Sequence, residues 1–287
     1  MEAAFVRSAG VGRRLLLPVD TRRLVAAAAS AAATTSSSSS AAPAPAAAMK
    51  TAAAPADDIV LVAPVPEARY EEVLSHVTPI FLRDEPLSRC FPPDASGARA
   101  ADFRAYAAQQ LRSGLCVAAL SGGRVVAACL NRVLPSAKVL GVDVRALGCE
   151  EDDPLNRNVL RLLTSVHQRL DLFGALGVSE LLEIGLISVE GSHTGRGLGT
   201  KVVKASLALG AAQGLQAVKA DCTGIASAKC CQKAGLVEIY SLPYDDYKPC
   251  GRVVFAGTRP PNEALRVYAG RLHCEEPYVS PLAGFKL

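Results

Sequence analysis

The sequence predicts an α/β fold with a mixed central sheet and flanking helices. Apolar runs of strand length alternate with stretches in which apolar residues recur at helical spacing, which is typical of a layered α/β domain. A Gly122-Gly123 pair between two apolar runs predicts a hairpin, and therefore an antiparallel part of the sheet. Residues 57–287 are enough for one domain with its own hydrophobic core.

The first 56 residues differ in composition from the rest. Residues 26–56 are almost entirely Ala, Ser, Thr and Pro, which offer no large side chains to bury. We therefore expect residues 1–56 to be a disordered extension and residues 57–287 to be the folded domain. The stretch Met1–Val25 is rich in Arg and poor in acids, as in a mitochondrial transit peptide, or it is an extension without a targeting role that a start at Met49 would omit. We expect a cytoplasmic protein, with a mitochondrial location as the alternative.

Positive charge is concentrated in this extension. The chain has a formal net charge of +4, and residues 1–56 carry six basic and two acidic side chains. The remaining part has 25 of each and is neutral. Nucleic-acid binding needs many phosphate contacts, so a neutral domain argues against it. No stretch reaches the roughly 18 uncharged apolar residues of a membrane span, so we expect no membrane association.

The nine cysteines all follow residue 89 and include no CxxC pair. Cys and His residues do not cluster at zinc-ligand spacing. We therefore expect reduced, mostly buried thiols and no metal.

The first half of the domain predicts two helices and three strands. The expected strands are a short buried one at Ile59–Val62, stopped by Pro64, and the two arms of the hairpin at Leu115–Leu120 and Val125–Val133. The expected helices are Glu67–Val77, which is followed by a polar segment with prolines, and Ala98–Leu111.

The second half predicts alternating helices and strands. A long amphipathic helix, Leu155–Phe173, has Pro154 near its first turn. The further expected helices are Lys201–Gln213 and Ala226–Ala234, and the expected strands are Leu181–Val189, Leu215–Ala220, Leu236–Tyr240 and Arg252–Ala256.

A glycine loop separates the strand at 181–189 from the helix that follows it. Gly195, Gly197 and Gly199 have the spacing G-x-G-x-G, which is neither a P-loop nor the G-x-G-x-x-G of a dinucleotide site. Backbone N–H groups at a helix N-terminus nevertheless bind phosphate, and Arg196 and Lys201 would add positive charge. A tight turn without a ligand is the alternative.

The residues around this loop resemble the GCN5-related N-acetyltransferase superfamily. Arg196-Gly-Leu-Gly-Thr-Lys is similar to the Arg/Gln-x-x-Gly-x-Gly/Ala loop that holds the pyrophosphate of acetyl-CoA there, with Lys201 in place of the usual Gly or Ala. Over about residues 57–272 the chain resembles the arthropod arylalkylamine (dopamine) N-acetyltransferases. The most specific match is Phe81-Leu-Arg-Asp-Glu-Pro-Leu-Ser, which the wider superfamily does not share. Cys222-Thr-x3-Ser-Ala-Lys and Pro243-Tyr-Asp-Asp-Tyr-Lys also match.

The resemblance implies the acyl-CoA N-acyltransferase fold and a set of site residues. Glu85 would be the general base, and Thr223 and Ser227 match two serines that take part in amine deprotonation or thiolate protonation. Alternatively, Glu85 caps a turn before Pro86, Thr223 caps the next helix and Ser227 is a small first-turn residue. The acetyl-CoA site would be formed by the strand edge and the loop, at Ile187, Ser188, Val189, Arg196, Gly197, Leu198, Gly199, Thr200 and Lys201.

The expected chemistry explains why a base is needed. A primary amine with a pKa near 10 is only ~0.1% neutral at pH 7, a deficit of roughly 4 kcal/mol, and a nearby carboxylate can take its proton. The general acid stays open among Ser227, Cys231 and water. Many superfamily members place a Tyr where Cys231 stands, and Ala226 replaces a Tyr that is common in the close relatives.

The resemblance therefore implies direct acetyl transfer from acetyl-CoA to the primary amine of a small arylalkylamine such as dopamine, serotonin or tyramine. The alternatives are a longer acyl-CoA, another small amine, or a CoA-binding protein without catalysis. We expect acetyl-CoA and the amine as partners of a monomer, with no nucleic acid, no membrane and no metal.

Overall fold

The structure, a computed structural model, describes residues 58–136 and 154–273. The expected disordered extension, including the stretch Met1–Val25 with a composition like that of a transit peptide, lies outside these residues. Cys90, Cys116, Cys129, Cys222, Cys230 and Cys231 carry free thiols.

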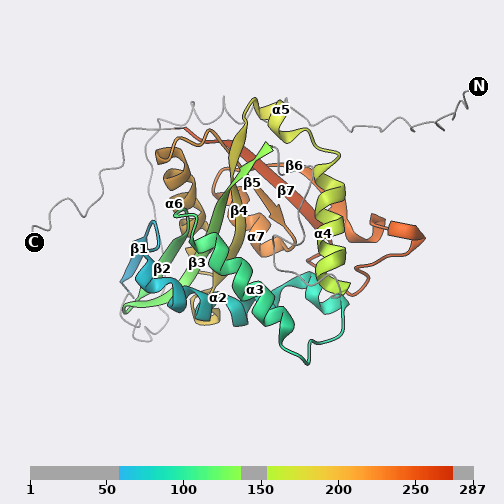
Figure 1. The fold of residues 1–287 in the computed structure, drawn as a ribbon, viewed down its shortest axis with the longest axis horizontal. Coiled ribbons are helices and arrows are strands. Elements are labelled where there is room, and N and C mark those ends of the chain that lie inside the picture. Colours follow the sequence, from blue (N-terminus) through green and yellow to red (C-terminus); the bar gives the residue numbers. More distant parts are fainter. Residues whose placement is uncertain (1–57, 137–153, 274–287) are drawn as a thin grey trace, which may run out of the picture.

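A seven-stranded mixed sheet forms the centre of the fold (Figure 1), in the order β1-β2-β3-β4-β5-β7-β6. Only the β4–β5 pair is parallel within the described ranges. This arrangement confirms the predicted mixed α/β class. The strands are β1 (Ile59–Val62), β2 (Val117–Ser121), β3 (Arg124–Pro135), β4 (Glu180–Val189), β5 (Ala217–Cys222), β6 (Val237–Pro243) and β7 (Ala264–Arg271).

Helices cover both faces of the sheet (Figure 1). α2 and α3 pack on β3 on one face, where α4 also lies, and α6 and α7 cover the other. Among the described residues, no helix is both long and apolar enough to cross a bilayer. The helices are α2 (Tyr70–Asp84), α3 (Ala98–Leu111), α4 (Pro154–His167), α5 (Leu172–Leu176), α6 (Leu198–Ala212) and α7 (Ile225–Lys233).

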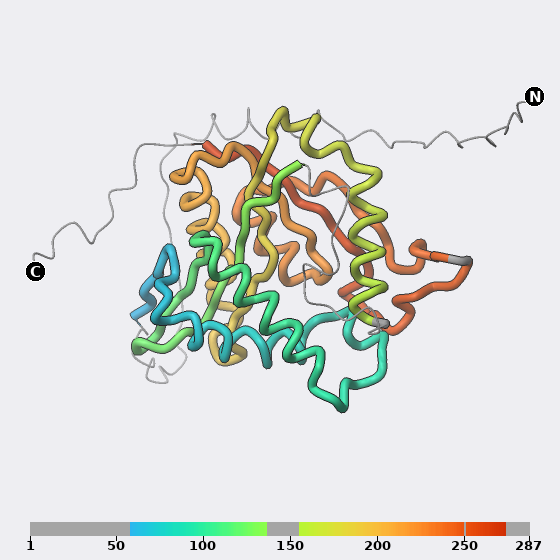
Figure 2. The backbone as a smooth tube through the Cα atoms, in the orientation of Figure 1, coloured from blue at the N-terminus to red at the C-terminus, as the bar shows by residue number. Residues whose placement is uncertain are grey.

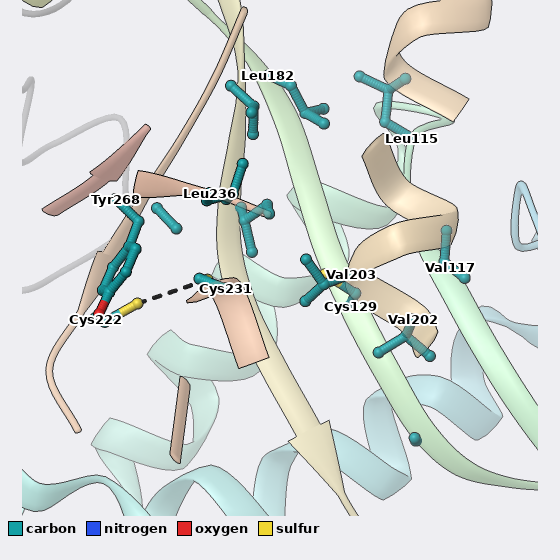
Figure 3. Packing of buried hydrophobic residues seen from close by; sticks show 14 of the residues in the cluster. Leu115, Val117, Cys129, Leu182, Val202, Val203, Cys222, Cys231, Leu236 and Tyr268 are labelled. Atoms are coloured by element: carbon teal, nitrogen blue, oxygen red, sulfur yellow. Dashed lines mark hydrogen bonds between the residues drawn. The ribbon is translucent and has the colours of Figure 1, made fainter. Parts of the chain in front are cut away.

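The strand alternation divides the core between the two faces. Leu182, Ile184, Val218 and Ala220 belong to a buried cluster with residues of α6 and α7. Figure 3 shows Leu182 of this cluster together with Cys222 and Cys231. Residues at the intervening positions of β4 and β5 point toward α3 and α4. The sheet is therefore buried on both sides in its centre, as its near-continuous apolar strands require.

β4 and β5 separate after a short parallel contact. β4 pairs with β5 through Leu182, Glu183 and Ile184, and no later pair is formed within the described residues. The register of β4 against β3 shifts at this point, which leaves Gly185 as the extra residue of a β-bulge. The C-terminal half of β4 therefore presents its backbone groups toward an opening between two parallel strands.

Two of the predicted helices differ from those in the structure. The helix predicted at Glu67–Val77 extends to Asp84 through Pro79, because Phe81 stacks on Phe103 of α3 with ring centroids 4.0 Å apart. The single helix predicted at 155–173 is two helices. Asp171 caps α5 by accepting from the Gly174 N–H at 3.0 Å, which starts a new helix.

Two predicted strands were also wrong in detail. Ile59–Val62 is a strand, but it lies at the edge of the sheet and leaves Val60 51% exposed. The strand predicted at Arg252–Ala256 is a loop, and the apolar residues there reflect Phe255, which is fully buried in the core. The last strand is instead β7, which follows Pro260-Pro261.

Candidate active site

The glycine loop connects β4 to α6 at the open end of the sheet, and its path can be followed in Figure 2. Gly195 and Gly197 have φ angles of 75° and 77°, and Gly197 is the N-cap of α6. The helix begins at Leu198 instead of the predicted Lys201, so Gly199, Thr200 and Lys201 form its first turn. The first N–H groups of a helix lack intrahelical acceptors, so this end can bind an anion.

Gly199 has a packing role within that turn. A Cβ built there would lie 2.6 Å from the Cys230 Sγ, and 3.6 Å from Cγ2 of both Ile187 and Val189. α6 therefore rests directly on β4 and α7. Arg196 and Lys201 are exposed beside this helix end and make it positive.

The predicted strand residues differ in the directions of their side chains. Ile187 and Val189 pack beneath α6, whereas Ser188 points to α2, where its Oγ lies 3.2 Å from the His76 Nε2. The Glu190 N–H donates to the Val126 carbonyl of β3 at 2.8 Å, and backbone groups alternate between the two edges of a strand. Ile187 and Val189 therefore present their backbone groups at the unpaired edge of β4, whereas those of Ser188 face β3.

Glu85 and Thr223 meet although they are far apart in the chain. The Thr223 hydroxyl donates to the Glu85 Oε2 at 3.1 Å, and the Leu87 N–H donates to the Glu85 Oε1 at 3.2 Å. Glu85 thus does cap the short helix after Pro86, and it also faces the end of β5. Thr223 does not cap α7, because the N-cap is Gly224.

Burial dominates the electrostatics of Glu85. It raises the pKa of the carboxyl above its ordinary value, and the hydrogen bonds from Leu87 and Thr223 oppose this rise. Asp84 lies in a different environment, because its exposed carboxylate forms a salt bridge with Arg83 at 2.7 Å that lowers its pKa. The structure therefore distinguishes the two adjacent acids, with Glu85 in the site.

The candidate general acids differ in accessibility. The Ser227 hydroxyl lies in the first turn of α7 and donates to the Gly224 carbonyl at 2.9 Å, close in the chain to Thr223. Cys231 is fully buried, and its Sγ lies 3.7 Å from the Cys222 Sγ (Figure 3). Its hydrogen bond with Cys222 and its burial raise the thiol pKa. Cys231 therefore lies in the core on the α7 side of the sheet, which favours Ser227 or water.

A buried ionic network that the sequence did not reveal lies at the base of the opening. The Lys219 ammonium, 2% exposed, lies 2.6 Å from both the Glu183 Oε1 and the Asp221 Oδ2. Arg132 also pairs with Glu183, and the His167 Nε2 lies 2.8 Å from the Asp221 Oδ2. Alternation along β4 and β5 aims these side chains at the face covered by α3 and α4. No sequence spacing marks the network, because it joins four separate elements.

His76 gives a pH prediction for stability. Burial is the main cause that lowers its pKa to about 4, and Arg124 adds to this, while Glu190 and Glu72 oppose it. The unfolded ring titrates near 6.5, so acid protonates the unfolded chain first. The stability of the folded protein should therefore fall between pH 6.5 and 4, by up to about 2 kcal/mol after allowance for partial exposure.

Urea unfolding of His76→Gln at pH 7 and pH 5 checks this prediction. From pH 7 to pH 5, the free energy of unfolding should fall less in the variant than in the parent protein. His273→Gln, at an exposed position, is the matched control and should behave like the parent. An unchanged pH dependence in His76→Gln would contradict the prediction.

Within the described residues, no three His, Cys, Asp or Glu side chains gather as a metal site would require. The site combines an anion-binding helix end, an unpaired strand edge and a half-buried carboxylate. Because β4 and β5 are parallel, their C-terminal ends lie at the same edge of the sheet, which places α6 and the Glu85–Thr223 pair on either side of the opening.

Comparison with known proteins supports the fold. No family model matches the chain. The structure is similar to that of arylalkylamine N-acetyltransferase 2 from Aedes aegypti, with a TM-score of 0.67, 23% identity, and coverage of 76% of this chain and all of that one. It is also similar to the polyamine N-acetyltransferase of Drosophila melanogaster that catalyses formation of N-acetylagmatine, with a TM-score of 0.64, 25% identity, and coverage of 75% and 100%. A mosquito arylalkylamine N-acetyltransferase-like 5b structure matches with a TM-score of 0.65 at 18% identity, with coverage of 75% and 100%. The chain thus has the fold of the GCN5-related N-acetyltransferases, as its sequence resemblance implied.

Proposed function

We propose that the protein transfers the acetyl group of acetyl-CoA to the primary amine of a small arylalkylamine. The observation that carries the proposal is the half-buried Glu85–Thr223 pair, which lies across the β4–β5 opening from the anion-binding end of α6. One side can hold the phosphates of a CoA thioester and the other can accept a proton from an amine.

The binding half rests on α6 and β4. Backbone N–H groups at Leu198, Gly199 and Thr200 would receive the pyrophosphate, with positive charge from Arg196 and Lys201. The unpaired edge of β4 after Gly185 would hydrogen-bond the amide groups of the pantetheine arm, and a strand N–H there would stabilise the oxyanion that forms on the thioester carbonyl.

The chemical step follows from the raised pKa of Glu85. The carboxylate takes a proton from the substrate ammonium, and the neutral amine nitrogen forms a bond to the thioester carbon. The carbon–sulfur bond then breaks, and Ser227 or a water takes the second proton from the nitrogen while it gives its own proton to the CoA thiolate, so that a neutral amide and the free thiol are formed. No covalent enzyme intermediate is needed, because amine and thioester react directly in one complex.

The substrate class can be tested with the full chain. Release of CoA thiol should be measured with acetyl-CoA and dopamine, serotonin, tyramine, phenethylamine or agmatine. We expect the arylalkylamines to give the highest kcat/KM, whereas highest activity with agmatine would favour a polyamine acceptor, which the 25% identical polyamine enzyme also suggests. A series of acetyl-, propionyl- and butyryl-CoA tests the donor. Binding of CoA without turnover of any amine would contradict catalysis.

Gly197 offers a matched test of the binding half. Gly197→Ala and Gly97→Ala change N-cap glycines with the same φ of 77°, at α6 and at α3 respectively, and neither Cβ would meet a neighbour. Both should lose about 1 kcal/mol of stability, because an L-residue is strained there. By calorimetry, only Gly197→Ala should also weaken acetyl-CoA binding. Equal affinities in the two variants would contradict the placement of the phosphates at α6.

A further inference from the structure

A tyrosine outside the acyl-transfer site continues the hydrogen-bond chain that begins at Glu85. Tyr244 follows β6 and is 1% exposed. Its hydroxyl donates to the Thr223 carbonyl at 2.7 Å, while the Thr223 hydroxyl donates to the Glu85 Oε2 at 3.1 Å. Thr223 is therefore hydrogen-bonded at two groups: its backbone carbonyl to Tyr244 and its side-chain hydroxyl to Glu85.

The ring of Tyr244 is itself fixed by packing. Its centroid lies 5.7 Å from that of Phe255, on which Tyr247 and Phe91 also pack at 5.9 and 6.1 Å. The Tyr244 N–H donates to the Glu263 carbonyl at 2.9 Å, which ties it to the segment before β7. The position of the Tyr244 hydroxyl at Thr223 is therefore fixed by ring packing and by a backbone hydrogen bond.

The same C-terminal segment holds the next two residues of the loop. α7 has no side-chain cap from its own N-cap, Gly224, and the Asn262 Oδ1 instead accepts from the Ile225 N–H at 2.9 Å. A Cβ at Gly224 would lie 3.1 Å from the Asn262 Oδ1 and 3.2 Å from the Pro86 Cγ. The turn between β5 and α7 is thus held between Pro86 and the segment that carries Asn262.

We infer that Tyr244 is a positioning residue for acetyl transfer, which holds the Thr223 backbone so that the Thr223 hydroxyl stays aimed at the Glu85 carboxylate. This inference rests on the proposed function, because it assigns Glu85 the role of base. Tyr244 does not touch the reacting atoms. It acts on Glu85 only through Thr223, and it lies about 160 positions beyond Glu85 in the chain.

The expected signature is a change in the titration of Glu85. The titratable groups that face Glu85 are Cys90 and Tyr244, and burial raises the pKa of both, so both stay neutral through the assay range. The Thr223 hydroxyl stabilises the ionised carboxylate and holds its pKa down. Loss of that hydrogen bond should therefore move the pKa of Glu85 upward.

Tyr244→Phe removes the hydroxyl and keeps the packed ring. We expect its kcat for the amine to fall about 2- to 10-fold, the range that one hydrogen bond accounts for. The acid limb of kcat/KM should move to higher pH, and the KM for acetyl-CoA should be unchanged. Thr223→Val should produce the same shift, and the double variant should shift no further than either single variant.

Tyr247→Phe is the matched control, because its ring packs on the same Phe255 and its hydroxyl forms no bond to Thr223 in the described structure. It should leave the acid limb in place. An unmoved limb in Tyr244→Phe, or shifts that add in the double variant, would overturn the positioning role.

Carbon-13 NMR titration of the Glu85 carboxyl separates this inference from the proposed function. It needs no turnover, so it reads the effect of Tyr244 even if no amine is acetylated. We expect a higher carboxyl pKa in Tyr244→Phe and in Thr223→Val than in the parent protein and Tyr247→Phe. The same pKa in all four proteins would overturn the inference whatever the enzyme assay shows.

Discussion

Replacement of Glu85 by Gln should lower kcat by at least about 100-fold, the usual contribution of a general base. Gln keeps the size of the side chain and can accept from the Leu87 N–H, so the short helix after Pro86 should persist. It cannot take a proton from an ammonium. Stopped-assay kinetics with saturating amine would measure the loss, and calorimetry should show that acetyl-CoA affinity is unchanged.

Stability gives a second readout of the same variant. The pKa of Glu85 is raised in the folded state, so ionisation lowers the stability of the fold as the pH rises from the unfolded pKa through the folded one. Glu85→Gln has no charge to desolvate and should be at least as stable as the parent at neutral pH. Lost activity could then not be ascribed to misfolding.

Asp84→Asn is the matched control for Glu85→Gln. It removes the neighbouring carboxylate, which is exposed and paired with Arg83. Activity should stay close to that of the parent, because Asp84 pairs with Arg83 and it is Glu85 that bonds to Thr223. The fold should also be preserved, because one surface ion pair contributes little to stability. If Asp84→Asn were inactive and Glu85→Gln active, the assignment of the base would be wrong.

Lys219→Met should produce the largest loss of stability, about 3–5 kcal/mol, because it removes the ammonium that two buried carboxylates share and leaves each with one partner, Arg132 for Glu183 and His167 for Asp221. The Lys219 Nζ lies 2.6 Å from oxygens of both Glu183 and Asp221, and the three side chains are almost completely enclosed. Urea unfolding monitored by circular dichroism at pH 7 would measure the change.

Two further variants make this prediction specific. Lys204→Met changes an exposed lysine of α6 and should cost less than about 0.5 kcal/mol. The double variant Lys219→Met/Asp221→Asn removes one of the two carboxylates and should recover part of the loss. If Lys219→Met were as stable as Lys204→Met, the network would not stabilise the fold.

The parts of the fold that follow local rules could be predicted from the sequence. Gly122 and Gly123 form the hairpin turn with Ser121 paired to Arg124, and α3 has its predicted bounds. The glycine loop lies between a strand and a helix as expected. These features depend on turn chemistry and periodicity over a few residues, which are visible without tertiary information.

Other features depend on contacts that the sequence does not display. Phe81 extends α2 because it stacks on Phe103. Phe255 is buried in a loop because three aromatic rings from two other segments pack on it. Leu170 and Leu172 continue the apolar pattern of α4 past its end, which hid the break before α5. In each case the apolar pattern along the chain reflects tertiary packing, so it does not give the correct type or end of the element.

The site shows the same division. Glu85, Thr223 and Ser227 were identified by resemblance to a family, and the structure brings Glu85 and Thr223 into contact. The contributions of Tyr244 and Asn262 are invisible in the sequence, because each acts through one hydrogen bond to a loop that lies distant in the chain.

Transfer of labelled acetyl from donor to amine tests the central claim most directly. The full chain would be incubated with acetyl-CoA carrying carbon-13 in the acetyl group and with dopamine, and the products would be resolved by mass spectrometry. The account predicts labelled N-acetyldopamine and free CoA in equal amounts, with almost none of either from Glu85→Gln. Label that stays on CoA with every arylalkylamine offered, although CoA binds, would contradict it.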